Sequence, residues 1–212
     1  MARGNGGDIG KTASWRSSIL KGVPVSLTNL LVPIYKQTLR AMSGWLDKAQ
    51  AQLSEADAEA LLSARLAPDM YPLSSQVCFV CLQAQEAVFR LRGETLPPAL
   101  DQLAAIGRNA GAQPGSLADA KARIAQALSF LDSLEPDALD TGAQRQITLA
   151  LPNGIIFDMT GDQYARDWAL AQFHFHLVTA YAILRNQGIN LGKADYVPHM
   201  FAYLRPGTMP TG

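Results

Sequence analysis

Four stretches of the chain carry apolar residues at steps of three and four positions, the spacing that places side chains on one face of an α-helix. They span residues 26–52, 73–92, 116–134 and 162–186. Each is long enough for roughly five helical turns or more. The sequence therefore predicts an all-α protein in which these helices pack as a four-helix bundle.

The segments between these stretches carry signals that end helices. Pro68 and Pro72 exclude a continuous helix between the first and second stretches. Residues 96–115 contain two proline-bearing breaks and are predicted to be a weakly structured connection. Residues 146–160 differ, because alternating apolar residues flank Pro152-Asn153-Gly154. That pattern predicts a short β-hairpin between the third and fourth long helices.

Composition limits the domain organisation and the compartment. A chain of 212 residues with 48% hydrophobic residues can bury a sizeable core without disulfides. We expect a leader over 1–22, one bundle domain over 23–196 and a tail over 197–212. With only two cysteines, the chain is predicted to be cytoplasmic; the basic leader leaves organelle targeting as the alternative. A formal net charge of zero and the lack of a long apolar run argue against nucleic-acid and membrane partners.

Three segments carry a resemblance to a known family. They read RLAPDMYPL (65–73, followed by Gln76-Val77), FHFHLVTAYAILR (173–185) and GINLGKADY (188–196). In this order they resemble a family described as a domain of unknown function, which looks like a branch of the DinB/YfiT-like superfamily. The resemblance covers about residues 23–196.

The resemblance implies an up-down-down-up bundle, often a homodimer, with a pocket among its helices. Better-known members of the superfamily bind a divalent metal through three histidines, and some are thiol-dependent transferases, isomerases or hydrolases. The comparison favours His176 as the matched histidine, while His174 stands where an aromatic residue is expected.

The metal site of these relatives fits this sequence poorly. His174 and His176 are two positions apart, so they point roughly 200° apart around a helix. The third histidine, His199, lies in the tail. We therefore expect no cofactor, with a divalent metal kept as the alternative. Cys78 and Cys81 form a CxxC pair, but within a predicted helix they are interpreted as small apolar side chains rather than a redox or zinc site.

His176 is the leading candidate for chemistry, because an imidazole in an apolar helix must be hydrogen-bonded or carry a desolvation penalty. It is either a satisfied core histidine or a general acid/base facing a cavity. His174, Asp69 and Tyr181 are candidate catalytic partners. Asp69 could instead cap the following helix with Arg65 as its ion partner. The predicted pocket-lining residues are Trp45, Arg65, Trp168, Phe173 and Tyr196.

Three functions remain open from the sequence, and whether the chain is an enzyme is left undecided. The first is a small-molecule enzyme that uses metal-free acid–base chemistry for isomerisation, cyclisation or elimination. The second is a metal- or thiol-dependent transferase or hydrolase like other DinB-like proteins. The third is a non-catalytic module for ligand binding or dimerisation. The predicted partners are a small molecule and a second copy of the chain.

Overall fold

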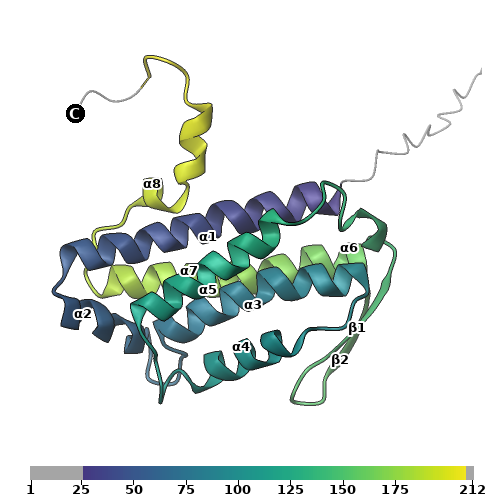
Figure 1. Ribbon diagram of the computed structural model, residues 1–212, viewed down its shortest axis with the longest axis horizontal. Coiled ribbons are helices and arrows are strands. Elements are labelled where there is room, and N and C mark those ends of the chain that lie inside the picture. The colour runs from purple at the N-terminus through teal and green to yellow at the C-terminus, as the bar shows by residue number, and fades with distance from the viewer. Residues whose placement is uncertain (1–25, 209–212) are drawn as a thin grey trace, which may run out of the picture.

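A computed structural model of the protein describes residues 26–208; the predicted leader over 1–22 lies outside them (Figure 1). The four long helices are α1 (Leu27–Gln52), α3 (Leu73–Arg92), α5 (Leu117–Asp132) and α7 (Leu170–Asn186). Shorter elements follow or join them: α2 (Glu55–Ala60), the 3-10 helices η1 (Leu61–Ser63) and η2 (Asp140–Gly142), α4 (Pro98–Asn109), α6 (Gly161–Gln163), the π-helix η3 (Tyr164–Ala169), α8 (Lys193–Tyr196) and η4 (Pro198–Tyr203).

The four long helices form a ring in which α1 contacts α5 and α7, and α3 contacts the same two helices from the opposite corner. Lys121 at the start of α5 pairs with Asp47 near the end of α1, so these two helices are antiparallel. α4 carries the chain back along the bundle, and as a result α3 and α5 run in the same direction (Figure 1). The predicted four-helix bundle with up-down-down-up order is confirmed.

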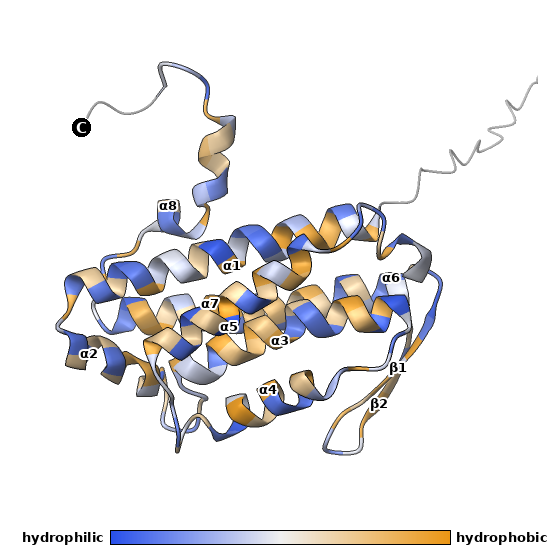
Figure 2. Ribbon diagram, viewed as in Figure 1, coloured by the Kyte–Doolittle hydropathy of each residue, from blue (hydrophilic) through white to orange (hydrophobic). Residues whose placement is uncertain are grey.

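The bundle interior is filled by the apolar faces of these helices. Each long helix mixes hydrophobic and hydrophilic residues along its length (Figure 2), and its hydrophobic residues supply most of the core. The largest fully buried side chains are Trp45, Tyr35, Tyr164 and Phe173. Burial of these surfaces is the main stabilising contribution to the fold.

The prediction of a weakly structured connection over 96–115 is wrong, because α4 occupies Pro98–Asn109. Pro98 is the first residue of α4. The backbone N–H groups in the first turn of a helix have no partner within the helix, so the N–H that proline lacks is not missed there. α4 packs against α3 through Leu100, which joins Phe79 and Leu82 in a small apolar cluster outside the main core. The pair of prolines therefore begins a helix rather than preventing one.

The predicted hairpin between α5 and α7 is confirmed. Strands β1 (Gln146–Ala150) and β2 (Ile156–Thr160) pair antiparallel, with Gln146 opposite Thr160 and Ala150 opposite Ile156. Gly154 in the connecting turn has a φ of 87°, which favours glycine.

The last long helix, α7, exposes large apolar residues on one face although its sequence is apolar along most of its length. Phe175 is 59% exposed and Val178 is 47% exposed, whereas Phe173 and Leu177 are fully buried. α7 therefore has a core face and an apolar face that no part of the described chain covers. Because both faces of α7 are apolar, its sequence lacks the contrast between apolar and polar residues that normally identifies the outer face of a helix.

Backbone segments touch directly where the end of α3 meets η2 and α6. A Cβ atom placed on Gly142 would lie 2.2 Å from the carbonyl oxygen of Leu91. One placed on Gly161 would lie 2.0 Å from the carbonyl oxygen of Gly142. Only glycine allows the three segments to approach this closely. This three-segment contact fixes the entry of the chain into the last helix.

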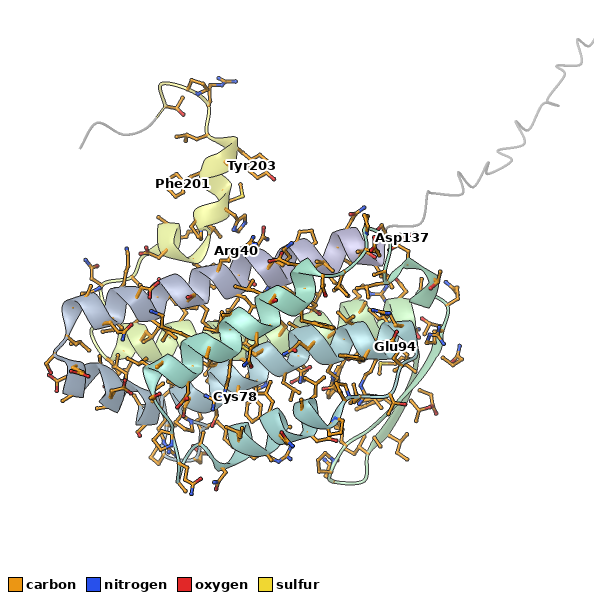
Figure 3. The ribbon with its side chains drawn as sticks, viewed as in Figure 1. Arg40, Cys78, Glu94, Asp137, Phe201 and Tyr203 are labelled. Atoms are coloured by element: carbon orange, nitrogen blue, oxygen red, sulfur yellow. The ribbon has the colours of Figure 1, made fainter. Side chains whose placement is uncertain are left out.

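After α7 the chain forms α8, and η4 then occupies residues 198–203 of the tail that is predicted over 197–212. Trp45 Nε1 donates a hydrogen bond of 2.8 Å to the carbonyl oxygen of Asp195, and Lys48 pairs with the Asp195 carboxylate. Beyond this attachment, η4 projects away from the bundle with Phe201 and Tyr203 on it (Figure 3). Across residues 26–208, none of the helices has the length and apolar character needed to cross a membrane.

Asp140 fastens the loop after α5 to the first turn of α1. Its carboxylate accepts hydrogen bonds of 2.9 Å from Ser26 Oγ, Thr28 N and Thr28 Oγ1. Because Asp140→Ala leaves these donors without their acceptor, we expect the free energy of unfolding to fall by about 2 kcal/mol in chemical denaturation. The exposed neighbour Asp137 is the control, and Asp137→Ala should change stability by less than about 0.5 kcal/mol. Equal losses in the two variants would contradict this role for Asp140.

Candidate functional site

The candidate site is a cavity of about 460 Å³ on the side of the bundle. It lies between the outer face of α3 and α4, and is bordered by the β-hairpin, η3 and α7. We call it the side cavity. Its lining residues are Tyr71, Phe79, Leu82, Gln83, Glu86, Arg90, Leu96, Leu100, Asp101, Ala104, Arg108, Leu149, Ala150, Leu151, Pro152, Trp168 and His176.

Helical spacing explains why α3 supplies one wall. Phe79, Gln83, Glu86 and Arg90 follow one another at steps of three or four, so they line one face of the helix. The opposite face of α3 points into the bundle core. α3 thus separates the core from the side cavity, and the cavity is outside the interior of the four-helix ring.

His176 reaches the side cavity from α7. Its Nδ1 lies 2.9 Å from Gln76 Oε1, and Gln76 Nε2 donates a hydrogen bond of 3.0 Å to the carbonyl oxygen of Tyr71. Since the amide nitrogen of Gln76 is already a donor, its oxygen must accept, and the hydrogen of the neutral imidazole must be on Nδ1. Nε2 then carries the lone pair. Gln76 therefore selects the tautomer of His176.

The surroundings of His176 keep it uncharged. Burial lowers the pKa of His176 to about 4. Its ring packs against Phe79 and Phe175, with centroids 4.9 Å and 5.3 Å away. At neutral pH the imidazole is an acceptor and a potential base, and not a cation.

Polar groups also stand on the α3 wall. Glu86 Oε1 and Arg90 Nε are 2.6 Å apart, and their side chains are only 15% and 23% exposed. Gln83 Oε1 is buried and has no hydrogen-bond partner among residues 26–208. A ligand with hydroxyl or amino hydrogens would satisfy such an acceptor if the amide turned toward the cavity.

α4 adds one negatively and one positively charged side chain to the cavity lining. Asp101 and Arg108 are exposed, line the cavity and are seven positions apart on one side of this helix. Gly107, next to Arg108, lies against Phe79, since a Cβ there would come within 2.7 Å of the Phe79 ring. Arg108 therefore stands at the end of the cavity that holds Phe79 and His176.

The structure brings together two of the residues singled out from sequence, His176 and Trp168, as lining of the side cavity. Trp168 sits in η3, and its ring centroid is 5.7 Å from that of Phe157 on β2. Phe173 does not line the cavity; it is fully buried in the core, 4.6 Å from the Tyr35 ring.

Three other predicted residues form a separate aromatic cluster. Trp45 stacks on Tyr196 at a centroid distance of 5.7 Å and meets the edge of Tyr181 at 5.3 Å. Tyr181 OH donates to the carbonyl oxygen of Leu191. None of the three lines the side cavity. The cluster attaches α8 to α1 and α7.

Arg65, Asp69 and His174 also lie apart from the cavity lining. Arg65 donates to the carbonyl oxygens of Pro68 and Met70, and thereby holds the loop before α3. Asp69 is exposed and does not cap α3, whose N-cap residue is Pro72 without a side-chain hydrogen bond. His174 Nδ1 lies 2.9 Å from the carbonyl oxygen of Leu170 in its own helix.

The residues present do not fit a three-histidine metal site. His174 and His176 leave α7 toward different partners, and His199 lies in η4. Within the described part of the chain, no three His, Cys, Asp or Glu side chains are grouped closely enough to hold an ion. Around His176 the neighbouring groups are an amide and aromatic rings, which are not ligands for a divalent metal.

The two cysteines are buried side chains of α3. Cys78 faces α4 (Figure 3) and Cys81 lies in the main core. Burial raises the pKa of both thiols. Because the thiolate is the reactive form, these cysteines are poor nucleophiles at neutral pH.

Sequence reasoning missed the residues that α4 and the hairpin contribute. After Pro98, the residues Leu100, Ala104 and Arg108 are spaced four apart. This spacing is typical of one face of a helix and could have indicated α4. Gln83, Glu86 and Arg90 could have been found on α3 as the polar face opposite its core stripe. Leu149 and Pro152 had no such signal, because the hairpin reaches the cavity only through the tertiary fold.

The helical fold is that of a DinB-like bundle protein. A crystal structure of a DinB family member protein from Shewanella denitrificans is similar to this chain, with a TM-score of 0.64 and 30% sequence identity. The similarity covers 87% of this chain and 96% of that one. The model of the family described as "Domain of unknown function (DUF1993)" matches residues 27–197, and the chain belongs to that family. A search of curated proteins found no match. The resemblance inferred from the three sequence segments is thus confirmed.

Proposed function

We propose that the side cavity binds a small molecule and that His176 Nε2 acts on it as a metal-free general base. The proposal rests on the hydrogen bond from His176 Nδ1 to Gln76, which leaves the lone pair of Nε2 available. His176 also lines the cavity. A volume of about 460 Å³ suits a small-molecule ligand.

Isomerisation, cyclisation or elimination fits this arrangement. In an isomerisation, Nε2 takes a proton from a carbon or oxygen of the ligand and the resulting imidazolium returns it at a second atom. No proton is gained or lost over the cycle. The low pKa keeps His176 unprotonated and available before the ligand binds. The cavity lining supports no step that requires Asp69, His174 or Tyr181, so the proposal rests on His176 alone.

The test begins with a thermal-shift screen of hydroxylated and amino-bearing metabolites, followed by an assay of each binder for conversion. His176→Gln should reduce kcat by about 10²–10⁴-fold, which is the usual contribution of a general base. His174→Gln removes an imidazole from the same helix but not from the cavity, and should retain the wild-type kcat. A substrate converted equally fast by His176→Gln and by the wild type would refute the mechanism.

A non-catalytic ligand-binding module is the second candidate, favoured by the presence of one potential base without a complete catalytic constellation. In that case Trp168→Ala should abolish the thermal shift caused by a ligand, while no binder is converted. The metal- or thiol-dependent alternative receives less support, because the groups around His176 are poor ligands and both thiols are buried.

A further inference from the structure

Two charged residues that line the side cavity have no partner in the described chain. Asp101 and Arg108 both belong to α4, and neither forms an ion pair within residues 26–208. Glu86 and Arg90 on the α3 wall, by contrast, pair with each other. Both α4 residues are exposed, so a ligand that enters from solvent can reach them. An unpaired charge in a cavity is a point at which a ligand group of opposite charge can be held.

These two charges stand in different parts of the cavity. Gly107 lies against Phe79, and α4 runs in the opposite direction to α3 (Figure 1). Since both helices rise by the same distance per residue, Asp101 lies about level with Gln83 on the α3 wall. Arg108 lies about level with Phe79, and the two charged residues are about 10 Å apart along α4. We call these parts of the cavity the Asp101 end and the Arg108 end.

The Asp101 end is rich in hydrogen-bond acceptors and has a net negative charge. Gln83 Oε1 is buried without a hydrogen-bond partner in the described chain, so turning this amide toward the cavity breaks no hydrogen bond of its oxygen. Glu86 and Asp101 contribute two negative charges at this level, and Arg90 contributes one positive charge. An alkylammonium group has three N–H donors and one positive charge, and therefore matches this end. A hydroxyl group would match the acceptors but not the charge.

The Arg108 end has one positive charge. Arg108 is the only charged lining residue at this level, because His176, whose ring packs on Phe79, is uncharged at neutral pH. A guanidinium group binds a carboxylate through two parallel hydrogen bonds. One cation balances a carboxylate, whereas a phosphate monoester has about two negative charges at pH 7. The Arg108 end is therefore suited to a carboxylate.

The wall between the two ends is apolar. Phe79, Leu82 and Leu100 form the small cluster outside the main core, and Ala104 packs against it. All four residues line the side cavity. This surface favours hydrocarbon and offers a polar group no hydrogen-bond partner. The polar groups of a ligand therefore belong at its two ends.

We propose that the ligand of the side cavity is a zwitterion, with an amino group at the Asp101 end, a carboxylate at Arg108 and an apolar body between them. This ligand class rests on the function proposed above, because it concerns the same cavity. His176 stands at the Arg108 end, so its Nε2 acts on the half of the ligand that holds the carboxylate. The charges of the ligand and of the cavity lining then cancel at each end.

Isothermal titration calorimetry of the full-length protein with three straight-chain probes tests the charge pattern. 8-Aminooctanoate has both charges on a chain chosen to match the distance of about 10 Å between the two ends. Octanoate lacks the amino group, and octylamine lacks the carboxylate. 8-Aminooctanoate should bind with a Kd of about 1 mM or lower, and each singly charged probe at least about 10-fold more weakly. Equal affinity for the three probes, or no binding of 8-aminooctanoate, would overturn the proposal.

Variants that remove one charge each assign the two ends. Arg108→Gln should weaken 8-aminooctanoate at least about 10-fold and leave octylamine unchanged. Asp101→Asn should weaken 8-aminooctanoate to a similar extent and leave octanoate unchanged. Arg123→Gln is the matched control, because it removes a cation of α5 that does not line the side cavity, and it should bind each probe as the wild type does. If Arg108→Gln and Asp101→Asn weakened all three probes equally, the assignment of the ends would be wrong.

Gln83→Leu separates a ligand contact from a structural role. Because Gln83 Oε1 makes no hydrogen bond within the described chain, this change should not lower the melting temperature. It should nevertheless weaken 8-aminooctanoate about 3- to 10-fold. A lower melting temperature with unchanged affinity would assign Gln83 to the fold and contradict its place in the site.

The ligand class and the general base can fail separately. If the metabolite screen yields only binders without one of the two charges, the zwitterion is wrong. Conversion of such binders by the wild type but not by His176→Gln would still support the base. If a zwitterionic binder is converted equally fast by His176→Gln and the wild type, the base is refuted and the ligand class stands.

Discussion

Gly161→Ala is expected to lower the free energy of unfolding by about 3–5 kcal/mol, and the melting temperature by about 10 °C. The added methyl group would lie 2.0 Å from the carbonyl oxygen of Gly142, and that oxygen belongs to backbone that cannot rotate away. Relief requires α6 to move from η2, which also shifts the start of α7. Gly142→Ala should have a similar effect through its contact with Leu91.

Gly44→Ala is the matched control for this prediction. Gly44 lies within α1, and no atom would come within 4 Å of its added methyl group. Alanine is a better helix former, so this change should stabilise the protein by about 0.5–1 kcal/mol. Chemical denaturation of the three variants measures the difference. A Gly161→Ala variant as stable as the wild type would show that the three-segment contact is looser than described.

Acidification should destabilise the protein through His176. The folded pKa of His176 is about 4, whereas an unfolded histidine titrates near pH 6.5. Between these values the unfolded chain binds a proton that the native chain does not. The free energy of unfolding should therefore fall as pH falls from about 6.5 toward 4, by a total of about 3 kcal/mol from this group.

The comparison of variants isolates this contribution from that of the carboxylates. In His176→Gln the extra loss of stability between pH 6.5 and 4 should disappear, while the loss below pH 4 should remain. His174→Gln is the matched control, because it removes an imidazole from the same helix that is not enclosed between Gln76 and Phe79. Urea denaturation at half-unit pH steps provides the curves. Parallel curves for the wild type and His176→Gln would contradict the burial of a neutral imidazole.

The helical bundle and the hairpin could be predicted because they depend on local patterns. The four long helices follow from the spacing of residues such as Leu31, Val80, Ile124 and Ile183, all of which are buried in the core. The hairpin follows from the turn signal around Gly154. In both cases the periodicity of the side chains matches the periodicity of the element that forms.

The site could be predicted only in part, because it depends on how separate elements meet. His176 and Trp168 were identified as unusual polar and aromatic residues in a long apolar helix, and both line the cavity. Trp45, Phe173 and Tyr196 were assigned to the same pocket on their aromatic character alone. Their contacts with Asp195, Tyr35 and Trp45 depend on the direction of each side chain, which residue type does not determine.

Because Gln76 is an uncharged partner of His176, it affects the strength of the proposed base. Many histidines that work as bases are backed by a carboxylate, which makes the ring more basic but introduces a buried negative charge. Here an uncharged amide orients the ring and at the same time holds the backbone at Tyr71. The loop before α3 is therefore tied to the orientation of the imidazole, and a shift of one moves the other. The proposed base is therefore modest in strength and uncharged at neutral pH, whereas a carboxylate partner would make it stronger but add a buried charge that must be balanced.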